Sequence, residues 1–169
     1  MSSTLLVRRA RSADADALGR LGCLLVTEHY EFDPQRFIAP VANLSERYGA
    51  FLVSQIERPQ MIVLVAERDE AVVGYAYAGV EGDDYMALRG PAGVLYDLVV
   101  DPDHRRQRVG TRLLDAALAE LARLGAPRVL LFTAEKNHAA QALFAGARFR
   151  RTMIEMTREL EPGAAAPRD

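Results

Sequence analysis

A strand–helix–strand unit at residues 94–134 constrains the fold of this chain more than any other feature. Val94–Val100 is an apolar, β-branched run, Gly110–Leu124 carries apolar residues at helical spacing, and Arg128–Ala134 is a second apolar run. A glycine and a proline end the helix before the second run. Two strands of one sheet joined through a helix run parallel, with a right-handed connection. The unit therefore predicts a parallel strand pair with a helix packed on it.

The remaining elements are predicted from the same kinds of pattern. In chain order they are a strand at 4–8, a helix starting at Ser12, an irregular segment at 28–40, a helix at 41–56, two strands at 61–67 and 71–80, a short helix from Asn137 and a final strand within 149–160. The strands at 61–67 and 71–80 are predicted to form a hairpin. We therefore expect a mixed α/β fold, with a central, mostly antiparallel sheet that contains one parallel pair and is flanked by helices.

The chain is predicted to form one domain. It has 169 residues, of which 50% are hydrophobic and 26% charged, the balance of a globular protein. It contains neither an internal repeat nor a linker, so we expect a single domain at residues 1–160 and a disordered tail at 161–169. A domain of roughly 150 residues buries about 68–70% of its unfolded surface, enough for a core without disulfides or metals. With one cysteine, Cys23, the chain cannot form an internal disulfide.

Charge and hydropathy exclude several classes of partner. The formal net charge of −2 argues against a protein that binds nucleic acid through a basic surface. The sequence opens on a polar run in place of a signal peptide, and it contains no apolar stretch approaching the 18 residues of a membrane helix. We therefore expect a cytoplasmic protein with neither a membrane nor a nucleic acid as partner.

An arginine-rich turn precedes the helix of the central unit. Arg105, Arg106 and Arg108 lie just before Gly110, where the first backbone N–H groups of the helix have no intrahelical partner. A helix start of this kind binds phosphate, arginines add charged hydrogen bonds, and a glycine lets a ligand approach the backbone closely. The pattern predicts an anion site. Two alternatives are a solvated turn without a ligand and a nucleic-acid contact, which the net charge supports weakly.

The same stretch resembles a family signature. VVDPDHRRQRVGTRLL is similar to the GNAT family of acyl-CoA-dependent N-acetyltransferases, in which a strand ending in V-x-P is followed by R/Q-x-x-G-x-G/A and a helix. Arg105 fills the first place of the pattern and Gly110 the last, while Arg108 stands at the middle glycine. The predicted order of strands and helices also agrees with the family fold.

A second block extends the resemblance. NHAAQALFAGARF is similar to the family region N-x-x-A-x-x-[LF]-[YF]-x-x-x-G-F, with Asn137, Ala140, Leu143 and Phe144 in register and Arg148 where glycine is common. One helix and one strand separate the two blocks, as in the family. Asn137 also fits an ordinary helix N-cap, and Leu143 and Phe144 also fit a hydrophobic core.

The resemblance implies a cofactor and its binding residues. Acetyl-CoA is expected as cosubstrate, with its pyrophosphate on the turn 105–111 and its pantetheine arm along residues 98–100, between the two parallel strands. The acetyl group would pass directly to the amine without a covalent acyl-enzyme, and no metal is assigned. The cofactor-binding residues expected on this basis are Leu98, Val99, Val100, Arg105, Arg106, Arg108, Val109, Gly110, Thr111, Asn137, Ala140 and Phe144.

Direct transfer to an alkylamine needs a base, because an amine with a pKa near 10 is mostly protonated at neutral pH. Asp97, on the strand before the turn, is the candidate base; a structural carboxylate that accepts backbone hydrogen bonds is the alternative. The amine-binding candidates are Glu28, His29 and Glu31, in a segment expected to border the acceptor pocket, together with Tyr77. A solvated acidic loop is the alternative for the first three.

The resemblance also raises the question of the general acid. Many family members carry a tyrosine at the position of Phe144, so water, another tyrosine such as Tyr30, Tyr77 or Tyr96, or no specific acid would serve here. The function expected is an N-acetyltransferase acting on the amine of a small molecule, or on a protein N-terminus or side chain. The alternative is an acyl-CoA-binding module with weak or no transferase activity. The resemblance further favours a homodimer.

Overall fold

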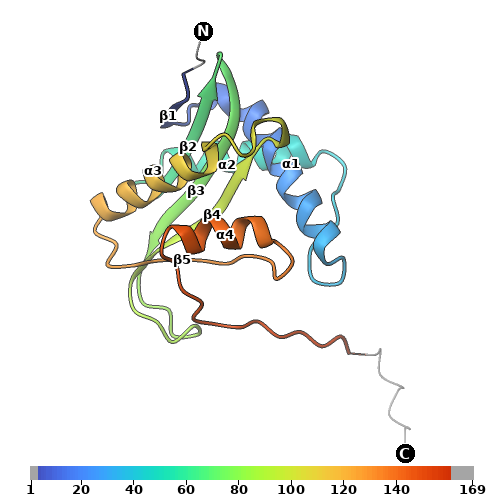
Figure 1. Ribbon diagram of the computed structural model, residues 1–169, viewed down its shortest axis with the longest axis vertical. Helices are drawn as coiled ribbons and strands as arrows, with labels where there is room; N and C mark the ends of the chain where they lie inside the picture. The colour runs from blue at the N-terminus through green and yellow to red at the C-terminus, as the bar shows by residue number, and fades with distance from the viewer. Residues whose placement is uncertain (1–3, 161–169) are drawn as a thin grey trace, which may run out of the picture.

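A five-stranded sheet forms the centre of the molecule in a computed structural model that describes residues 4–160 (Figure 1). Its strands lie in the order of the chain: β1 (Leu6–Arg9), β2 (Met61–Arg68), β3 (Ala71–Glu81), β4 (Ala92–Val100) and β5 (Val129–Leu131). Neighbouring strands from β1 to β4 are antiparallel, and β5 is parallel to β4. The predicted mixed α/β sheet, its hairpin and its parallel pair are therefore confirmed.

Helices cover both faces of this sheet. They are α1 (Ala15–Phe32), α2 (Leu44–Ile56), α3 (Val109–Arg123) and α4 (His138–Gly146), with short 3₁₀ turns at Ser12–Asp14 and Pro102–His104. One face packs on α3 and α4 through a core that includes Leu113 and Leu121, and the other packs on α1 and α2 through a core that includes Leu18 and Leu52 (Figure 1). All four of these leucines are fully buried.

The two parallel strands stay together over a short distance. Only Gly93–Leu95 of β4 pairs with β5, and the remainder of β4 runs on to Val100 without a neighbour on that side among residues 4–160. Residues 96–100 of β4 therefore expose one row of backbone groups where the two strands separate. The start of α3 follows directly beyond this point.

The segment predicted as irregular from residue 28 is helical at its beginning. The helix α1 continues through Glu28, His29 and Glu31 and ends at Phe32, before Asp33 adopts an extended conformation. Residues 28–32 contain neither glycine nor proline, whereas Pro34 disfavours helical geometry in the residue before it. The prediction of a loop was therefore wrong for these five residues, which occupy the last turns of α1.

The predicted final strand is also absent. Residues 149–160 form neither strand nor helix, and they leave the body of the molecule as an extended segment (Figure 1). The prediction was wrong because a strand needs a hydrogen-bonded neighbour, and this segment runs clear of the sheet. The predicted disordered tail, 161–169, lies outside the described residues. Among the helices of residues 4–160, none combines the length and the hydropathy that a membrane crossing requires.

Candidate active site

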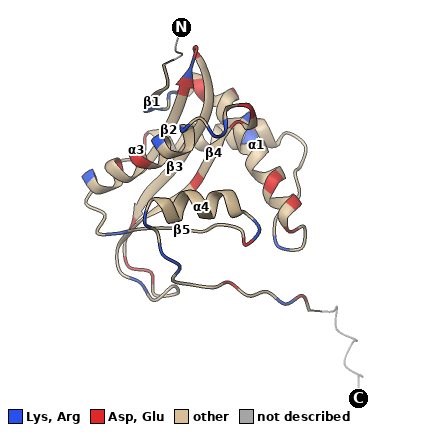
Figure 2. Cartoon of the chain, in the orientation of Figure 1, with Lys and Arg blue, Asp and Glu red and all other residues tan. Residues whose placement is uncertain are grey.

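The arginine-rich turn leads from the end of β4 into α3. After the 3₁₀ turn at Pro102–His104, Arg106 and Arg108 both adopt left-handed backbone conformations, with φ of 59° and 63°. Arg108 is the N-cap of α3 and makes no side-chain capping bond, so the first N–H groups of α3 have neither an intrahelical nor a capping partner. Figure 2 shows the basic residues of the turn beside the start of α3. Free N–H groups and adjacent guanidinium groups form an arrangement suited to phosphate.

Arg105 connects the turn to the helix on the other face of the sheet. Its guanidinium forms an ion pair with the Glu28 carboxylate of α1, and its Nε donates to the carbonyl of Val100 at 3.2 Å. The side chains of Arg106 and Arg108 are exposed. Of the three arginines predicted at the turn, one is held by the protein and two face solvent.

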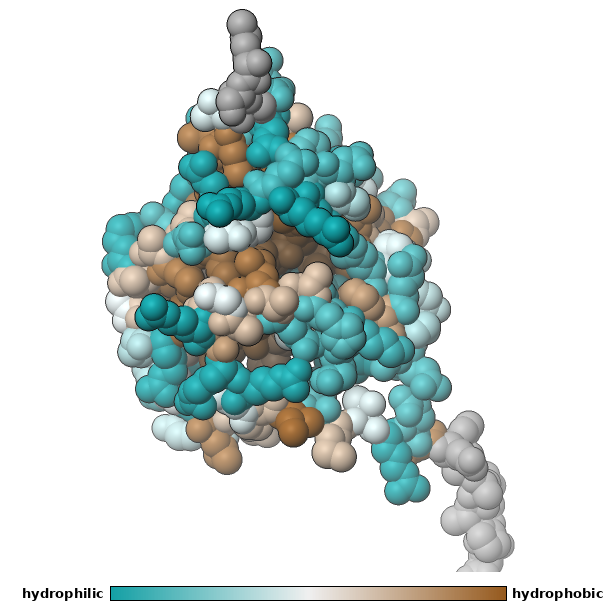
Figure 3. All heavy atoms as spheres, viewed as in Figure 1, coloured by the Kyte–Doolittle hydropathy of each residue, from teal (hydrophilic) through white to brown (hydrophobic). Residues whose placement is uncertain are grey.

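Gly110 lies where the fold itself would accept a larger residue. A Cβ atom built there would lie 3.4 Å from Cδ2 of Leu143 and 3.6 Å from Cγ2 of Val100, which is ordinary van der Waals contact. Packing within the protein therefore does not require glycine at this position. Figure 3 shows a hollow on this face, over α3 and α4, with hydrophobic residues at its floor and hydrophilic residues at its rim. A ligand close to the backbone at the start of α3 would explain the missing side chain.

The second block forms α4 and fixes its two ends. Asn137 is the N-cap, its Oδ1 accepting from the backbone N–H of Ala140 at 3.1 Å. At the other end the N–H of Phe149 donates to the carbonyl of Phe144, and the N–H of Arg148 donates to that of Ala145, both at 3.0 Å. This is a Schellman motif with Arg148, at φ 67°, in the position that glycine usually occupies.

Phe144 is packed into the hydrophobic core. Its side chain is 8% exposed and contacts Phe149 with ring centroids 5.8 Å apart. It belongs to the core beneath α3. The side chain at this position is thus a buried hydrocarbon ring without a hydroxyl.

Asp97 is held by two tyrosines at an irregularity of β4. Tyr77 pairs with Asp97 and Ala78 with Leu95, so Tyr96 is an extra residue in β4, a β-bulge that turns the side chains around it. The hydroxyls of Tyr48 and Tyr75 donate to Oδ2 of Asp97 at 2.7 and 3.0 Å.

Burial determines the electrostatics of this group. Desolvation raises the pKa of Asp97 above its usual value, and the two tyrosine hydrogen bonds only partly oppose this. Desolvation and the nearby carboxylate also raise the pKa values of Tyr48 and Tyr75, so both remain protonated donors at neutral pH. Asp97 is therefore a partly buried carboxylate, bonded to hydroxyls, whose protonation is easier than that of an ordinary aspartate.

A pocket of about 210 Å³ opens beside Asp97. His29 lies in its wall, and its Nδ1 is 2.8 Å from the carbonyl oxygen of Leu25. Because a carbonyl can only accept, Nδ1 carries the proton of that hydrogen bond, and Nε2 is the other polar atom of the ring. The remaining lining residues are Leu25, Val26, Phe37, Ile38 and Tyr96. The pocket thus combines two proton-accepting side chains with apolar walls.

The structure brings some of the predicted acceptor residues together and separates others. His29 and Asp97 share the pocket. Glu28 instead pairs with Arg105, and Glu31 is exposed outside the pocket lining. Tyr77 is buried beneath Tyr96, and its hydroxyl donates to Oε1 of Gln55 at 3.3 Å. It therefore supports the pocket from below.

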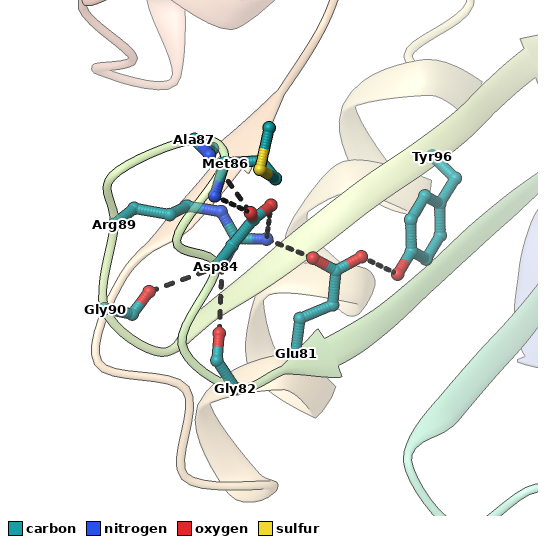
Figure 4. A network of polar contacts seen from close by, with 8 residues as sticks. All are labelled: Glu81, Gly82, Asp84, Met86, Ala87, Arg89, Gly90 and Tyr96. Carbon is teal, nitrogen blue, oxygen red and sulfur yellow. Dashed lines mark hydrogen bonds and ion pairs between the residues drawn. The ribbon is translucent and has the colours of Figure 1, made fainter.

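Tyr96 is held in place from outside the pocket (Figure 4). Its hydroxyl donates to Oε1 of Glu81 at 2.6 Å, and Glu81 forms an ion pair with Arg89. Arg89 also lies 3.7 Å from Asp84 and donates to the carbonyls of Gly82 and Gly90, at 3.2 and 3.3 Å. Glu81 and Asp84 are thus occupied by Arg89, and neither of them lines the pocket.

Two residues of the site were missed by the sequence analysis. Tyr48 lies in the helix predicted at 41–56 and Tyr75 in the strand predicted at 71–80, and neither was given a role at the site. Their signal was the polar end of a tyrosine: a buried hydroxyl needs a partner, and Asp97 supplies it. Tyr75 and Tyr77 also lie two apart on the strand that pairs with the Asp97 strand, which places both on one face.

A larger hollow of about 490 Å³ lies between α1 and α2. Two of the side chains that line it, Asp16 and Glu46, are exposed carboxylates, and neither the arginine turn nor Asp97 contributes to it. This hollow therefore shares no residue with the pocket beside Asp97.

Known proteins resemble this chain in sequence. A mycothiol acetyltransferase from Nocardioides sp. is 29% identical over 153 residues, which make up 86% of this chain and 49% of that protein. An uncharacterized N-acetyltransferase of Bacillus subtilis, YhfO, is 28% identical over 138 residues, 82% of this chain and 85% of its own length. The chain spans about half the length of the Nocardioides relative.

Solved structures resemble it in fold. A mutant of the BH1408 protein from Bacillus halodurans superposes with a TM-score of 0.78 at 17% identity, over 92% of this chain and 99% of that one. The aminoglycoside N-acetyltransferase AAC(6')-Iy, in complex with CoA, superposes with a TM-score of 0.71 at 16% identity, over 95% and 97%. The family model of the Acetyltransferase (GNAT) family matches residues 25–147, which include the turn, Asp97 and nearly all of the second block. The chain therefore belongs to the GNAT family of acetyltransferases.

Proposed function

We propose that this chain transfers an acetyl group from acetyl-CoA to the amine of a small molecule by direct attack. The observation that carries the proposal is the position of two features on one strand. The strand β4 presents Asp97 to the acceptor pocket and, beyond Val100, leads into the arginine turn and the free start of α3. The end of β4 and the turn that follows it thus connect a proton acceptor to an anion site.

The residues at the start of α3 fit a pyrophosphate group. The N–H groups of Val109, Gly110 and Thr111 would bind its oxygens, and Arg106 and Arg108 would add charge from exposed positions. Residues 98–100 of β4 lie on the edge that β5 leaves open, where the Val100 carbonyl accepts from Arg105, and their backbone groups would hold the amides of the pantetheine arm. Acetyl-CoA supplies an activated acyl group, and the protein mainly positions it.

In this proposal Asp97 takes the proton of the attacking amine. Within residues 4–160 both hydrogen bonds to this carboxylate fall on Oδ2, which leaves Oδ1 for the proton. A raised pKa brings a carboxylate closer to the operating pH and so makes it a better catalytic base. His29 lies in the same wall and would orient the amine through Nε2.

The pocket limits the class of acceptor. Its apolar walls and its volume of about 210 Å³ suit a small primary amine with a hydrophobic neighbouring group. The acidic residues Glu28 and Asp84 are held by arginines, so a multiply charged cation would find fewer partners here than the acidic composition of the segment suggests. Relatives named for mycothiol and for aminoglycosides supply two further amine classes to examine.

A second candidate function is an acyl-CoA-binding module with weak or no transfer. It is favoured by Phe144, whose buried ring replaces the hydroxyl that would protonate the leaving thiolate. A thiol pKa of about 8.5 makes unaided departure of the thiolate feasible, which is why we prefer the enzyme.

Release of free thiol from acetyl-CoA tests both functions. We expect at least one small amine, from a panel that includes alkylamines, aminoglycosides and amino sugars, to accelerate release above the buffer rate. Isothermal titration with CoA is the parallel measurement. Binding without turnover by any amine would replace the enzyme with the binding module, and absence of both would reject the cofactor site.

Substitution of Gly110 distinguishes an effect on CoA binding from an effect on the stability of the fold. Gly110→Ala should raise the free energy of unfolding by up to about 1 kcal/mol, because alanine is the better helix former and the site has room for it. It should weaken CoA binding at least tenfold. Gly146→Ala is the matched control, since a Cβ there meets nothing within 4 Å and should leave CoA affinity unchanged. Equal CoA affinity in both variants would show that CoA does not bind against Gly110.

A further inference from the structure

Tyr48 connects the helix α2 to Asp97. Its hydroxyl donates to Oδ2 of that carboxylate at 2.7 Å. The second donor, Tyr75, is fully buried on β3, which pairs with the strand of Asp97. The sheet therefore fixes the position of Tyr75, whereas the position of Tyr48 depends on how α2 packs against α1 and the sheet.

Two glycines of α1 allow this packing to be close. A Cβ atom built at Gly19 would lie 2.8 Å from the carbonyl carbon of Ser45, in α2. One built at Gly22 would lie 2.7 Å from Cγ and 2.8 Å from Cε1 of Tyr48. Both separations are too short for a real Cβ atom, so a side chain at either glycine would displace its neighbour. The Tyr48 ring thus occupies the space beside α1 that a side chain at residue 22 would fill.

We propose that Tyr48 is a positioning residue for the candidate base: its ring packs against Gly22, and its hydroxyl holds Oδ2 of Asp97 and stabilises the charged carboxylate. This inference rests on the proposed function, in which the charged carboxylate takes the proton of the amine. A hydrogen bond donated to a carboxylate favours its charged form. Burial opposes the charge of Asp97, so the Tyr48 hydroxyl increases the fraction of this group that is charged at neutral pH.

The other titratable side chains around Asp97 come from α1, β3 and β4. They are His29, Tyr75, Tyr77 and Tyr96. Protonation of His29 would also favour the charged form of Asp97. The hydroxyls of Tyr77 and Tyr96 donate to other partners. Replacement of Tyr48 by phenylalanine therefore removes one hydrogen bond of Asp97 and leaves the remaining groups in place.

Titration of the Asp97 carboxyl group tests the inference without a substrate. The full chain is isotope-labelled at the side-chain carboxyl carbon of aspartate for nuclear magnetic resonance, and Asp97→Asn identifies the signal by difference. In Tyr48→Phe the midpoint of the Asp97 titration should rise by about one pH unit, because a hydrogen bond to a charged group is lost while the ring keeps its packing. Tyr77→Phe is the matched control, since its hydroxyl bonds Gln55, and it should leave the midpoint unchanged. An unmoved midpoint in Tyr48→Phe, or an equal rise in both variants, would overturn the proposal.

Gly22→Ala tests the contact between α1 and the Tyr48 ring. The added Cβ atom should displace the ring, so the midpoint for Asp97 should rise although both tyrosine hydroxyls are still present. Combining Gly22→Ala with Tyr48→Phe should give no further rise, because the hydrogen bond is already lost. Circular dichroism shows whether each variant folds, and the comparison of Tyr48→Phe with Tyr77→Phe does not depend on Gly22→Ala. A wild-type midpoint in folded Gly22→Ala would reject Gly22 as the residue that positions Tyr48.

The pH profile of kcat/KM connects the inference to the reaction. With the same amine in both proteins, the acidic limb of Tyr48→Phe should lie about one pH unit above that of the wild type, and the two profiles should converge at higher pH. A purely structural role would instead lower kcat/KM by one factor at every pH. His29→Gln identifies any part of the profile that belongs to the imidazole. Turnover with an unmoved limb would overturn the role of Tyr48 alone, whereas absence of turnover with every amine would reject the proposed function.

Discussion

Two carboxylates of this protein, the buried Asp14 and the partly buried Asp97, have opposite surroundings. Asp14, at the start of α1, receives two hydrogen bonds from the Arg8 guanidinium, at 2.8 and 2.9 Å, and a third from the backbone N–H of Arg11 at 2.7 Å. The pairing with Arg8 lowers the pKa of Asp14. Asp97 receives only tyrosine hydroxyls, and burial raises its pKa.

The different hydrogen-bond donors suit Asp14 to stabilising the fold and Asp97 to accepting a proton. A carboxylate beside an arginine is held in its charged form, and here that charge ties β1 to α1. A carboxylate bonded only to neutral hydroxyls retains much of the cost of burying a charge, and it can lower that cost by taking a proton. The fold therefore gains stability at Asp14 and keeps a group ready for protonation at Asp97.

Removal of the Asp97 charge should produce the largest effect. Asp97→Asn preserves an oxygen for Tyr48 and Tyr75 but cannot take a proton, so kcat/KM should fall by about 10²- to 10⁴-fold, the usual contribution of a catalytic base. The melting temperature should be unchanged or higher, since a buried charge is lost. Wild-type kcat/KM in this variant, measured with the best amine of the panel, would contradict the assigned role.

The matching change at the other carboxylate should act on stability. Asp14→Asn leaves the Arg8 charge without its main partner, and breaking such a pair costs about 3 kcal/mol. Glu67, which also binds Arg8 at 2.7 Å, should keep the loss at the lower end of the range. Urea unfolding measures the change, and kcat/KM at low temperature should match the wild type. A loss of activity in the folded variant would show that the two carboxylates are not independent.

The pH dependence of stability should have opposite signs at the two sites. The folded pKa of Asp14 is lowered, so its contribution is present above the unfolded pKa near 3.9 and is lost as pH falls through the folded value. The folded pKa of Asp97 is raised, so its contribution is present below the unfolded pKa and is lost as pH rises through the folded value.

Unfolding free energies from pH 3 to 8 check these signs. Asp14→Asn should differ from the wild type mainly at neutral pH, as a loss. Asp97→Asn should also differ mainly at neutral pH, but as a gain. The same sign in both variants would remove the contrast between the sites.

A smaller change in the free energy of unfolding is expected at Arg148, where backbone conformation and not charge is the cause. Arg148 adopts the left-handed conformation that ends α4, where glycine avoids the steric cost of a side chain. Arg148→Gly should raise the free energy of unfolding by about 1 kcal/mol or less. Arg150→Gly is the control, because this neighbouring residue is exposed and has an ordinary φ. Stabilisation of the control by the same amount would assign the effect to lost charge.

Local patterns predicted most of the framework. The stripe of α3, the hairpin of β2 and β3 and the parallel pair of β4 and β5 all follow from periodicity, turn residues and chain connectivity, which neighbours in sequence determine. The arginine turn was predicted for the same reason. Its left-handed residues Arg106 and Arg108 were not, because a non-glycine residue carries no signal of positive φ.

Features that depend on distant neighbours were not predicted. The final strand failed because alternation of apolar residues shows that a segment can pair, but not whether a partner strand lies beside it. The tyrosines around Asp97 come from α2 and β3, and only the packing of α2 on the sheet brings Tyr48 within 2.7 Å of that carboxylate. The division of the acidic residues into free and arginine-bound groups likewise depends on contacts such as that between Glu28 and Arg105.

The hydrogen bonds and ion pairs around Arg89 affect the entropy cost of binding another molecule to the β3–β4 loop. Arg89 and Asp84 connect both sides of the β3–β4 loop, and Asp84 also accepts from the N–H groups of Met86 and Ala87, at 2.9 and 3.0 Å (Figure 4). Fixing a backbone residue costs about 1–2 kcal/mol in conformational entropy, and in this loop that loss occurs when the chain folds. A molecule that binds the exposed tip therefore does not have to order the loop again, and this part of the entropy cost does not oppose association.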